Sequence, residues 1–239
     1  MNVIVWTLLT SHVGVMVTSI YLHRGLCHKQ FTMNPVLEHI FRFLMWITEG
    51  IVSKDFVAQH RKHHKYSDVQ GDPHSPKLCG YWKVTSQCLI PNFFKKYRYF
   101  LDEWALQNYG GGTPEDWLEK NVYCHTKLGP LVLLVINLFL FGWVGMVSWV
   151  CSMFITSFFM NAMITGFGHW FGYTNYKMRD HTKNVFPIGI LSCGEVLHHN
   201  HHKTPGNPNF SHKWFEFDLG WFYIRILSKL RLLKVNKSI

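Results

Sequence analysis

The chain has 239 residues, of which 48% are hydrophobic and 16% charged, and its 24 lysines and arginines outnumber 14 acidic residues to give a formal net charge of +10. Such a charge can indicate nucleic-acid binding, but these cations adjoin apolar segments and alternate with Trp, Tyr and Phe, which favours contact with anionic lipid headgroups. We therefore expect no nucleic-acid partner. The six cysteines form no CxxC pair, which argues against a zinc finger.

Two long segments, residues 1–22 and 128–170, contain no Lys, Arg, Asp or Glu. Because about 20 apolar helical residues cross the hydrocarbon core of a bilayer, the first segment predicts one span and the second predicts two. We expect these spans at about 3–22, 128–148 and 150–170, with a turn near 145–152. No basic residue precedes the first apolar run, which argues against a cleaved signal peptide.

The remaining segments, 23–127 and 171–239, hold all the charged residues and are expected in the cytoplasm, where cationic loops are retained. Residues 33–53 are nearly long enough to span, but Glu38, Arg42 and Glu49 favour an amphipathic helix in the interface. Residues 81–106 are aromatic and basic and predict helix at the membrane surface. The sequence thus predicts one all-α integral-membrane domain, 1–239, with about three transmembrane helices, interfacial helices and a cytoplasmic histidine-rich helical cap.

The cap contains an unusual pattern of histidines. His60, His63 and His64 have the spacing HxxHH, and so do His198, His201 and His202. At about 100° per residue, each triplet falls within one helix face, whereas His199 points away. His23 and His28 follow the first span and lie about 140° apart on an ideal helix, so they could reach different metals or lie on two sides of one cluster. His169 ends the last span. By contrast, the isolated His12, His39, His125 and His212 are interpreted as structural.

These nine imidazoles exceed what one metal ion takes and predict two metals, each with four or five nitrogen ligands. The predicted ligands are His23, His28, His60, His63, His64, His169, His198, His201 and His202. Imidazole ligation alone is compatible with iron, zinc, copper or nickel.

Neighbouring acidic residues are candidates for orienting these imidazoles through their free N–H groups. Glu195 precedes His198 by three residues and would lie on roughly the same helix face. Asp68, Asp72 and Asp218 are further candidates. His74, in "GDPHSP", is predicted to support the ligands rather than to join them.

Three histidine motifs, "HRGLCH", "HRKHH" and "HHNHH", together with "GDPHSP" and "GHWFGY", make the chain resemble the membrane fatty acid desaturases over nearly its whole length. It is most similar to the bacterial branch that acts at carbon 9, judged by "GGTPEDW" and "KWFEFDLGWFYIRIL". The resemblance implies two iron ions, with O2 as co-substrate and two external electrons, and formation of a cis double bond in the acyl chain of a lipid or thioester. Oxidation of an unactivated C–H bond requires a redox metal, which disfavours zinc.

The sequence departs from the family pattern at two places. The family often carries Asn four residues before the histidine that ends the last span, where it holds a metal-bound water. Here that position is Thr165, whose hydroxyl can also hold a water. The family usually has two spans before its first histidine motif, whereas the first 22 residues supply one.

The resemblance also implies a separate electron donor of the ferredoxin, rubredoxin or cytochrome b5 type with its reductase, since no haem, flavin or ferredoxin motif occurs in the chain. The expected location is a bacterial inner membrane with the active site on the cytoplasmic side. Basic residues that suit an acidic donor, or equally lipid headgroups, are Lys62, Lys65, Lys95, Lys96 and Arg98.

Three alternative functions fit part of the pattern. A lipid or alkane hydroxylase would use the same di-iron histidine cluster. A metal transporter would place ionisable residues inside its spans, but residues 128–168 offer only two asparagines and small hydroxyl side chains. A structural lipid-binding protein would leave the nine histidines unexplained.

Overall fold

The computed structural model describes residues 2–94, 102–185 and 190–236. Lys95, Lys96 and Arg98, which are candidate contacts for an electron donor, lie outside these ranges. The described chain is mainly helical, as predicted. It also forms a small antiparallel sheet that the all-α expectation missed, in which β1 (Phe31–Met33) pairs with β2 (Leu233–Val235).

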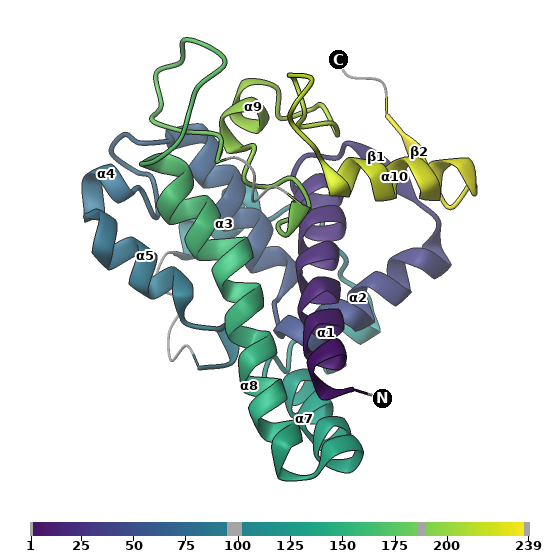
Figure 1. The fold of residues 1–239 in the computed structure, drawn as a ribbon. Coiled ribbons are helices and arrows are strands. Elements are labelled where there is room, and N and C mark those ends of the chain that lie inside the picture. The colour runs from purple at the N-terminus through teal and green to yellow at the C-terminus, as the bar shows by residue number, and fades with distance from the viewer. Residues whose placement is uncertain (1, 95–101, 186–189, 237–239) are drawn as a thin grey trace.

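Two long apolar helices lie side by side and form the stalk of the molecule (Figure 1). The first consists of α1 (Val3–Val17) and the π-helical η1 (Thr18–Cys27). The second runs through α8 (Trp143–Ser157), the π-helical η4 (Phe158–Gly166) and the 3₁₀ turn η5 (Phe167–His169). With 25 and 27 residues, these are the two helices of the described chain that are long and apolar enough to cross a membrane, judged by length and composition.

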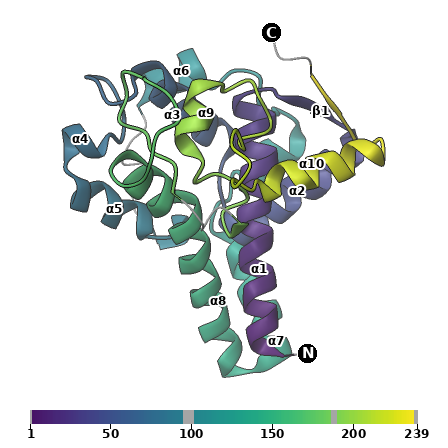
Figure 2. The ribbon, with the colours of Figure 1, turned by 45° about the horizontal axis from the view of Figure 1, so that its top comes forward.

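Small polar side chains let these two helices approach closely. The hydroxyls of Thr7 and Ser148 lie 2.7 Å apart, and the Thr156 hydroxyl donates to the carbonyl of Ser11 at 3.3 Å. Small and hydroxyl-bearing residues are typical of helix contacts inside membranes. Both helices run toward the same end of the molecule (Figure 2). His23 and His28, at the end of the first helix, therefore lie near His169, at the end of the second.

The predicted turn at 145–152 is wrong, because the break between the last two apolar helices lies at Gly142. There φ is 60° and ψ is −144°, a conformation that is restricted almost entirely to glycine. The preceding helix, α7 (Leu128–Phe141), therefore has 14 residues. At about 1.5 Å per residue it is about 21 Å long, shorter than the ~30 Å hydrocarbon core.

The predicted amphipathic helix is present as α2 (Pro35–Glu49), which packs against α1 and α7. Its start is fixed by the Asn34 side chain, which accepts a hydrogen bond from Val36 N–H, and it ends at Gly50 with φ of 58°. Arg42 is buried, and its guanidinium donates to Asp116 at 2.5 and 2.7 Å and to Glu119, in the π-helical η3 (Glu119–Tyr123), at 3.1 Å. The charge of Arg42 is therefore paired with acidic side chains of the protein itself.

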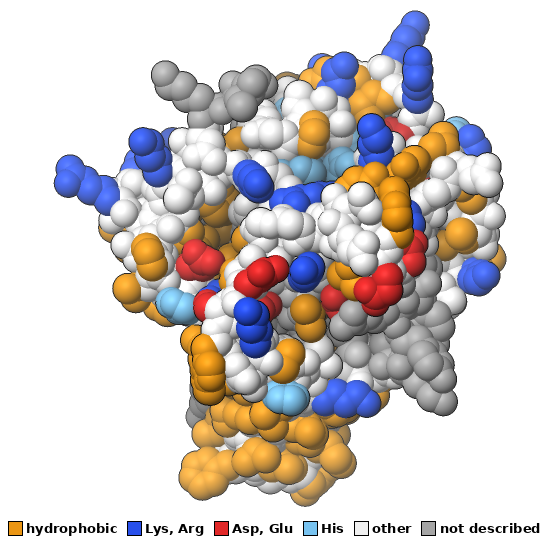
Figure 3. Space-filling view, turned by 180° about the vertical axis from the view of Figure 1, so that it is seen from behind, with side chains coloured by type: hydrophobic (Ala, Val, Ile, Leu, Met, Phe, Trp, Pro, Cys, Tyr) orange, Lys and Arg blue, Asp and Glu red, His pale blue; other side chains and the backbone are white. Residues whose placement is uncertain are grey.

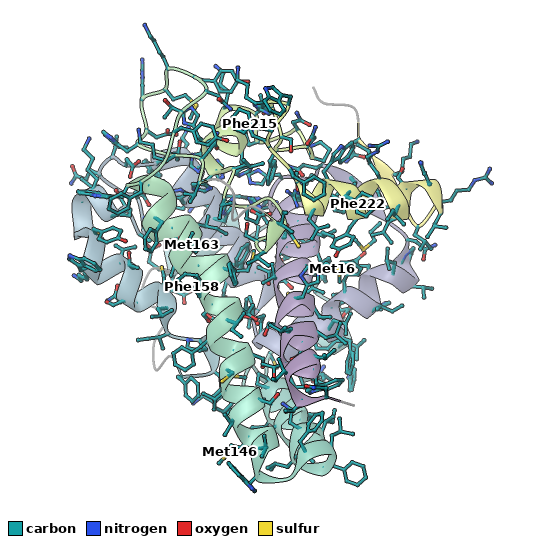
Figure 4. The ribbon with its side chains drawn as sticks, viewed as in Figure 1. Met16, Met146, Phe158, Met163, Phe215 and Phe222 are labelled. Carbon is teal, nitrogen blue, oxygen red and sulfur yellow. The ribbon has the colours of Figure 1, made fainter. Side chains whose placement is uncertain are left out.

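Helices surround the upper end of the stalk. They are α3 (Ser53–Tyr66), α4 (Pro76–Cys79), α5 (Tyr81–Leu89), the 3₁₀ turn η2 (Asn92–Phe94), α6 (Glu103–Tyr109), α9 (His198–Lys203) and α10 (Leu219–Lys229). The lower end presents mainly apolar side chains, whereas charged groups gather above it (Figure 3). Met146 marks the lower end of the stalk and Phe215 the opposite end of the molecule (Figure 4).

Candidate metal centre

The structure gathers the nine predicted histidines into two adjacent groups. Cluster A combines residues of η1, its C-terminal end, α3 and α9, and consists of His23, His28, His60, His64 and His201. Cluster B combines residues of α3, η5 and α9, and consists of His63, His169, His198 and His202. Within each cluster one ring nitrogen from every histidine lies within 4.8 Å of those of the others. Each cluster can therefore surround one metal ion.

Both HxxHH motifs contribute to both clusters. On α3, His60 and His64 belong to cluster A and His63 to cluster B. On α9 the pattern is reversed, since the two residues four apart, His198 and His202, belong to cluster B. Residues i and i+4 lie one above the other on a helix, whereas residue i+3 lies to the side. The single face expected for each triplet is thus wide enough to supply two neighbouring metals.

His23 and His28 enter the same cluster because η1 is a π-helix. The N–H of His28 donates to the carbonyl of His23 at 3.2 Å, an i→i+5 hydrogen bond. Such a bond brings residue i+5 about one turn beyond residue i, so the two rings lie on one face. Of the two arrangements that an ideal α-helix left open, the structure shows the one in which both histidines belong to one cluster.

The spacing of the ring nitrogens fits a metal ion in each cluster. The Nε2 atoms of His23 and His201 are 3.0 Å apart, and those of His28 and His60 are 2.8 Å apart. In cluster B, the Nε2 atoms of His169 and His198 are also 3.0 Å apart. With metal–imidazole bonds of about 2.0–2.1 Å, two ligands at right angles lie about 3 Å apart.

The nitrogens also have the right chemical state for ligation. Burial, followed by the neighbouring imidazoles, lowers the pKa of His60, His64 and His202 well below the ordinary value, so these rings are neutral and keep a free lone pair. The Nε2 atoms of His63 and His202 are buried and accept or donate no hydrogen bond within the described residues. Buried polar atoms rarely lack partners, and metal ions in these clusters would supply them.

Four of the nine histidines have a carboxylate partner on Nδ1 among the residues that the structure describes. His23 lies 2.5 Å from Glu195, and His202 lies 3.1 Å from Asp180. The pairs His63–Asp72 and His169–Asp68 are each 3.0 Å apart. A carboxylate on Nδ1 fixes the ring and its tautomer, directs Nε2 toward a metal and makes it a stronger donor.

These carboxylates are themselves held in place. Asp72 accepts the backbone N–H groups of Asp68 and His74 at 2.8 and 3.0 Å. Burial alone would raise the pKa of Asp72, but the hydrogen bonds with the His63 side chain and the backbone N–H of His74 outweigh it and the pKa is lowered. Glu195 likewise keeps a lowered pKa despite its burial, because His23 and Arg24 lie beside it. Both groups are therefore anionic supports.

Two of the predicted supporting acids act differently from the expectation. Since α9 begins at His198, Glu195 lies in the preceding turn and contacts His23 rather than the face of α9. Asp218 contacts Arg24, whose Nη2 lies 3.0 Å from both carboxylate oxygens, and caps α10. It therefore supports the site through Arg24 rather than through a histidine.

Of the other predicted supporting residues, His74 contacts cluster B. The ring of His74 stacks on His63 at 4.5 Å, and its Nδ1 lies 3.2 Å from the amide nitrogen of Gln59. Thr165 is half-buried in η4, and its hydroxyl forms no hydrogen bond to another described residue. Asp180 was missed by the sequence analysis, because it lies in the irregular stretch "MRDHTK", where no periodicity predicts its partner.

Histidines that were not predicted to bind metal have other contacts. Nε2 of His199 lies 3.1 Å from the backbone N–H of Tyr176, and its Nδ1 lies 3.0 Å from the carbonyl of Thr182. His12 lies 2.8 Å from the hydroxyl of Tyr223 in the stalk. His199 therefore links α9 to the segment that contains Tyr176 and Thr182, and His12 links α1 to α10.

An apolar helical stalk topped by two histidine clusters that can bind metal ions is the architecture expected of a membrane-associated metal oxidoreductase. Comparison with known proteins agrees: the model of the fatty acid desaturase family matches residues 1–218. The chain belongs to the fatty acid desaturase family and is an oxidoreductase.

Relatives of known function support this assignment. The chain is 25% identical to Delta-9 acyl-lipid desaturase 1 of Arabidopsis thaliana, over 92% of this chain and 70% of that protein. It is 26% identical to the sn-1 stearoyl-lipid 9-desaturase of a Synechocystis strain, over 95% of this chain and 68% of the relative. It is also 28% identical to the hex-5-enoyl-[acyl-carrier protein] acetylenase of Moorena producens, over 90% and 70% of the two chains.

Proposed function

We propose that the protein is a di-iron, O2-dependent fatty acyl desaturase that introduces a cis double bond at carbon 9 of an acyl chain carried by a lipid or thioester. The observation that carries the proposal is the pair of adjacent histidine clusters, with nine converging imidazoles, at one end of an apolar stalk. The choice of carbon 9 is supported by relatives named for that position.

The nine histidines would hold the two irons. Cluster A offers five imidazoles to one iron, and cluster B offers four to the other. A water molecule on Thr165 would complete the second set, since Thr165 lies four residues before His169 in the same helix. Bound iron would supply the oxidising power that no amino-acid side chain has, in the overall conversion RCH2–CH2R′ + O2 + 2 e⁻ + 2 H⁺ → RCH=CHR′ + 2 H2O.

The chain itself provides orientation and a dry environment. The carboxylates on His23, His63, His169 and His202 keep those rings aimed inward. Met160, Met163 and Ile164 are buried where the second long helix approaches the clusters, so the surroundings of the clusters on this side are apolar. An acyl chain would meet an apolar environment there.

In the membrane, the helices Val3–Cys27 and Trp143–His169 would span the bilayer, with α7 as a third, shorter membrane helix, in a single domain over 1–239. The histidine clusters would face the cytoplasm of a bacterial cell, where a separate electron donor with its reductase docks. Among the basic residues that could contact the donor and that the structure describes, Lys65 is exposed. The ammonium group of Lys62 lies 2.7 Å from a carboxylate oxygen of Asp102, so its charge is already paired within the chain.

Expression in a host that lacks its own desaturase tests the activity directly. Fatty-acid profiling with location of the double bond should show cis-9 unsaturated chains for the natural sequence and none for His63→Ala. A hydroxylated chain would instead indicate the hydroxylase alternative, and a profile unchanged from the empty host would contradict the proposal.

A further inference from the structure

Helix α9 supplies three of the nine clustered histidines, although it has only six residues. Isolated helices shorter than about 12–15 residues are marginal in water, so a helix this short depends on tertiary contacts for its position. Its N-cap residue, Leu197, provides no side-chain hydrogen bond to the first turn. Something else must therefore fix the rotation of α9, on which the direction of its three imidazoles depends.

The central residue of "HHNHH", Asn200, lies on the side of α9 away from the clusters and is completely buried. Its Oδ1 accepts from the amides of Asn175 at 2.8 Å and Asn184 at 2.9 Å. Its Nδ2 donates to the carbonyl of Phe210 and to Oε2 of Glu216, both at 2.8 Å. All four hydrogen-bonding positions of the side-chain amide are thus used.

The partners of Asn200 form a closed network around it. Glu216 accepts the Tyr173 hydroxyl at 2.8 Å and the Asn175 amide at 2.7 Å on Oε1, and the backbone N–H of Lys213 at 2.8 Å on Oε2. The backbone N–H of Asn200 also donates to Oδ1 of Asn184 at 3.2 Å. The network joins α9 to two separate segments, 173–184 and 210–216. A fully satisfied buried network of this kind specifies one arrangement.

We propose that Asn200, anchored by Glu216, is a positioning residue that sets the rotation of α9 and thereby the geometry of both metal clusters. The inference rests on the proposed function, since it assumes that the clusters bind metal. His198 and His202 belong to cluster B and His201 to cluster A, so any rotation of α9 moves ligands of both metals at once. A carboxylate that supports one imidazole, such as Asp72 on His63, affects one cluster only.

The test uses Asn200→Asp in the full-length protein in detergent. Aspartate has nearly the same shape, but it places an acceptor opposite the Phe210 carbonyl and Glu216, where Asn200 donates. The matched control is Asn108→Asp in α6, because the Asn108 amide is exposed and donates only to the carbonyl of Trp104 at 2.8 Å within the described residues. The comparison variant is Asp72→Asn. Iron affinity is measured by titration, and each iron is followed by ⁵⁷Fe Mössbauer spectroscopy.

We expect Asn200→Asp to weaken iron binding on the order of 10- to 100-fold, as loss of a supporting contact does, and to alter the quadrupole signals of both irons. Asp72→Asn should alter one signal, and Asn108→Asp neither. If Asn200→Asp does not fold, Glu216→Gln, which keeps the volume and removes the charge, is measured in its place with the same expectation. Unchanged affinity and spectra in the folded variant would overturn the inference, whereas a natural protein that binds no iron would overturn the proposed function itself.

Discussion

Glu195 offers the sharpest test of how the chain supports its metal ligands. Its Oε2 lies 2.5 Å from Nδ1 of His23, while Oε1 accepts the Ser19 hydroxyl at 2.6 Å. Glu195→Gln keeps an oxygen for His23 but removes the charge, so we expect about 10-fold weaker metal binding, or ~1.4 kcal/mol. Glu195→Ala removes the contact as well and leaves buried Arg24 with less acidic support. For this variant we expect about 100-fold weaker binding, or ~2.8 kcal/mol.

The assay is a competitive Fe(II) titration that resolves the two sites, with Glu115→Gln as the control. Glu115 is exposed and lies 3.5 Å from Lys54, an ion pair of the kind that contributes little. Only the site with five imidazoles should weaken, because His23 belongs to cluster A. Equal affinities in all four proteins, or weakening confined to cluster B, would refute the reasoning.

Three further predictions follow from the structure. The Arg61 guanidinium donates to the carbonyls of Leu26 and Cys27 at the end of η1, and to those of Tyr109 and Gly111. Arg61→Lys cannot form this fork of hydrogen bonds, so we expect it to reduce the iron retained in cluster A, measured by metal analysis. The control variant Lys65→Arg should retain as much iron as the natural protein. Burial lowers the pKa of His60 and His64 below 6.5, so at low pH the unfolded chain binds protons that the folded chain does not. The thermal midpoint of the metal-free protein should therefore decrease as the pH is lowered from about 7.5 to 5.5. An increase in the midpoint over this range would contradict the assignment. Gly142→Ala should lower the free energy of unfolding in detergent by about 1–3 kcal/mol, because φ is 60° at this position. No atom lies within 4 Å of an added Cβ, so the cost comes from the backbone conformation and not from a steric clash. An unchanged unfolding midpoint would show that the hairpin does not need this conformation.

Much of the candidate site follows from local periodicity. The HxxHH spacing places His60, His63 and His64 on one helix face whatever that face contacts, and the structure directs this face toward α9. The division of each triplet between two clusters depends on how α3 and α9 lie against each other. That arrangement is a tertiary property, which no local pattern contains.

The points that the sequence left open or placed wrongly have local physical causes. Whether His23 and His28 bind one metal or two was left open because ideal α-helical geometry separates them, whereas the chain there is π-helical. The hairpin turn was placed too late because the apolar run continues past Gly142, and hydropathy does not register a glycine with positive φ. Asp180 lies in an irregular segment, where only the folded structure shows that it lies 3.1 Å from His202.

The central claim is that the two histidine clusters hold two iron ions. It is tested most directly by metal analysis of the purified full-length protein after growth with ⁵⁷Fe, combined with Mössbauer spectroscopy. The account predicts two irons per chain in two distinct nitrogen-rich environments, because the clusters offer five and four imidazoles. Protein that retains zinc or no metal after iron reconstitution, or that binds one iron per chain, would contradict it.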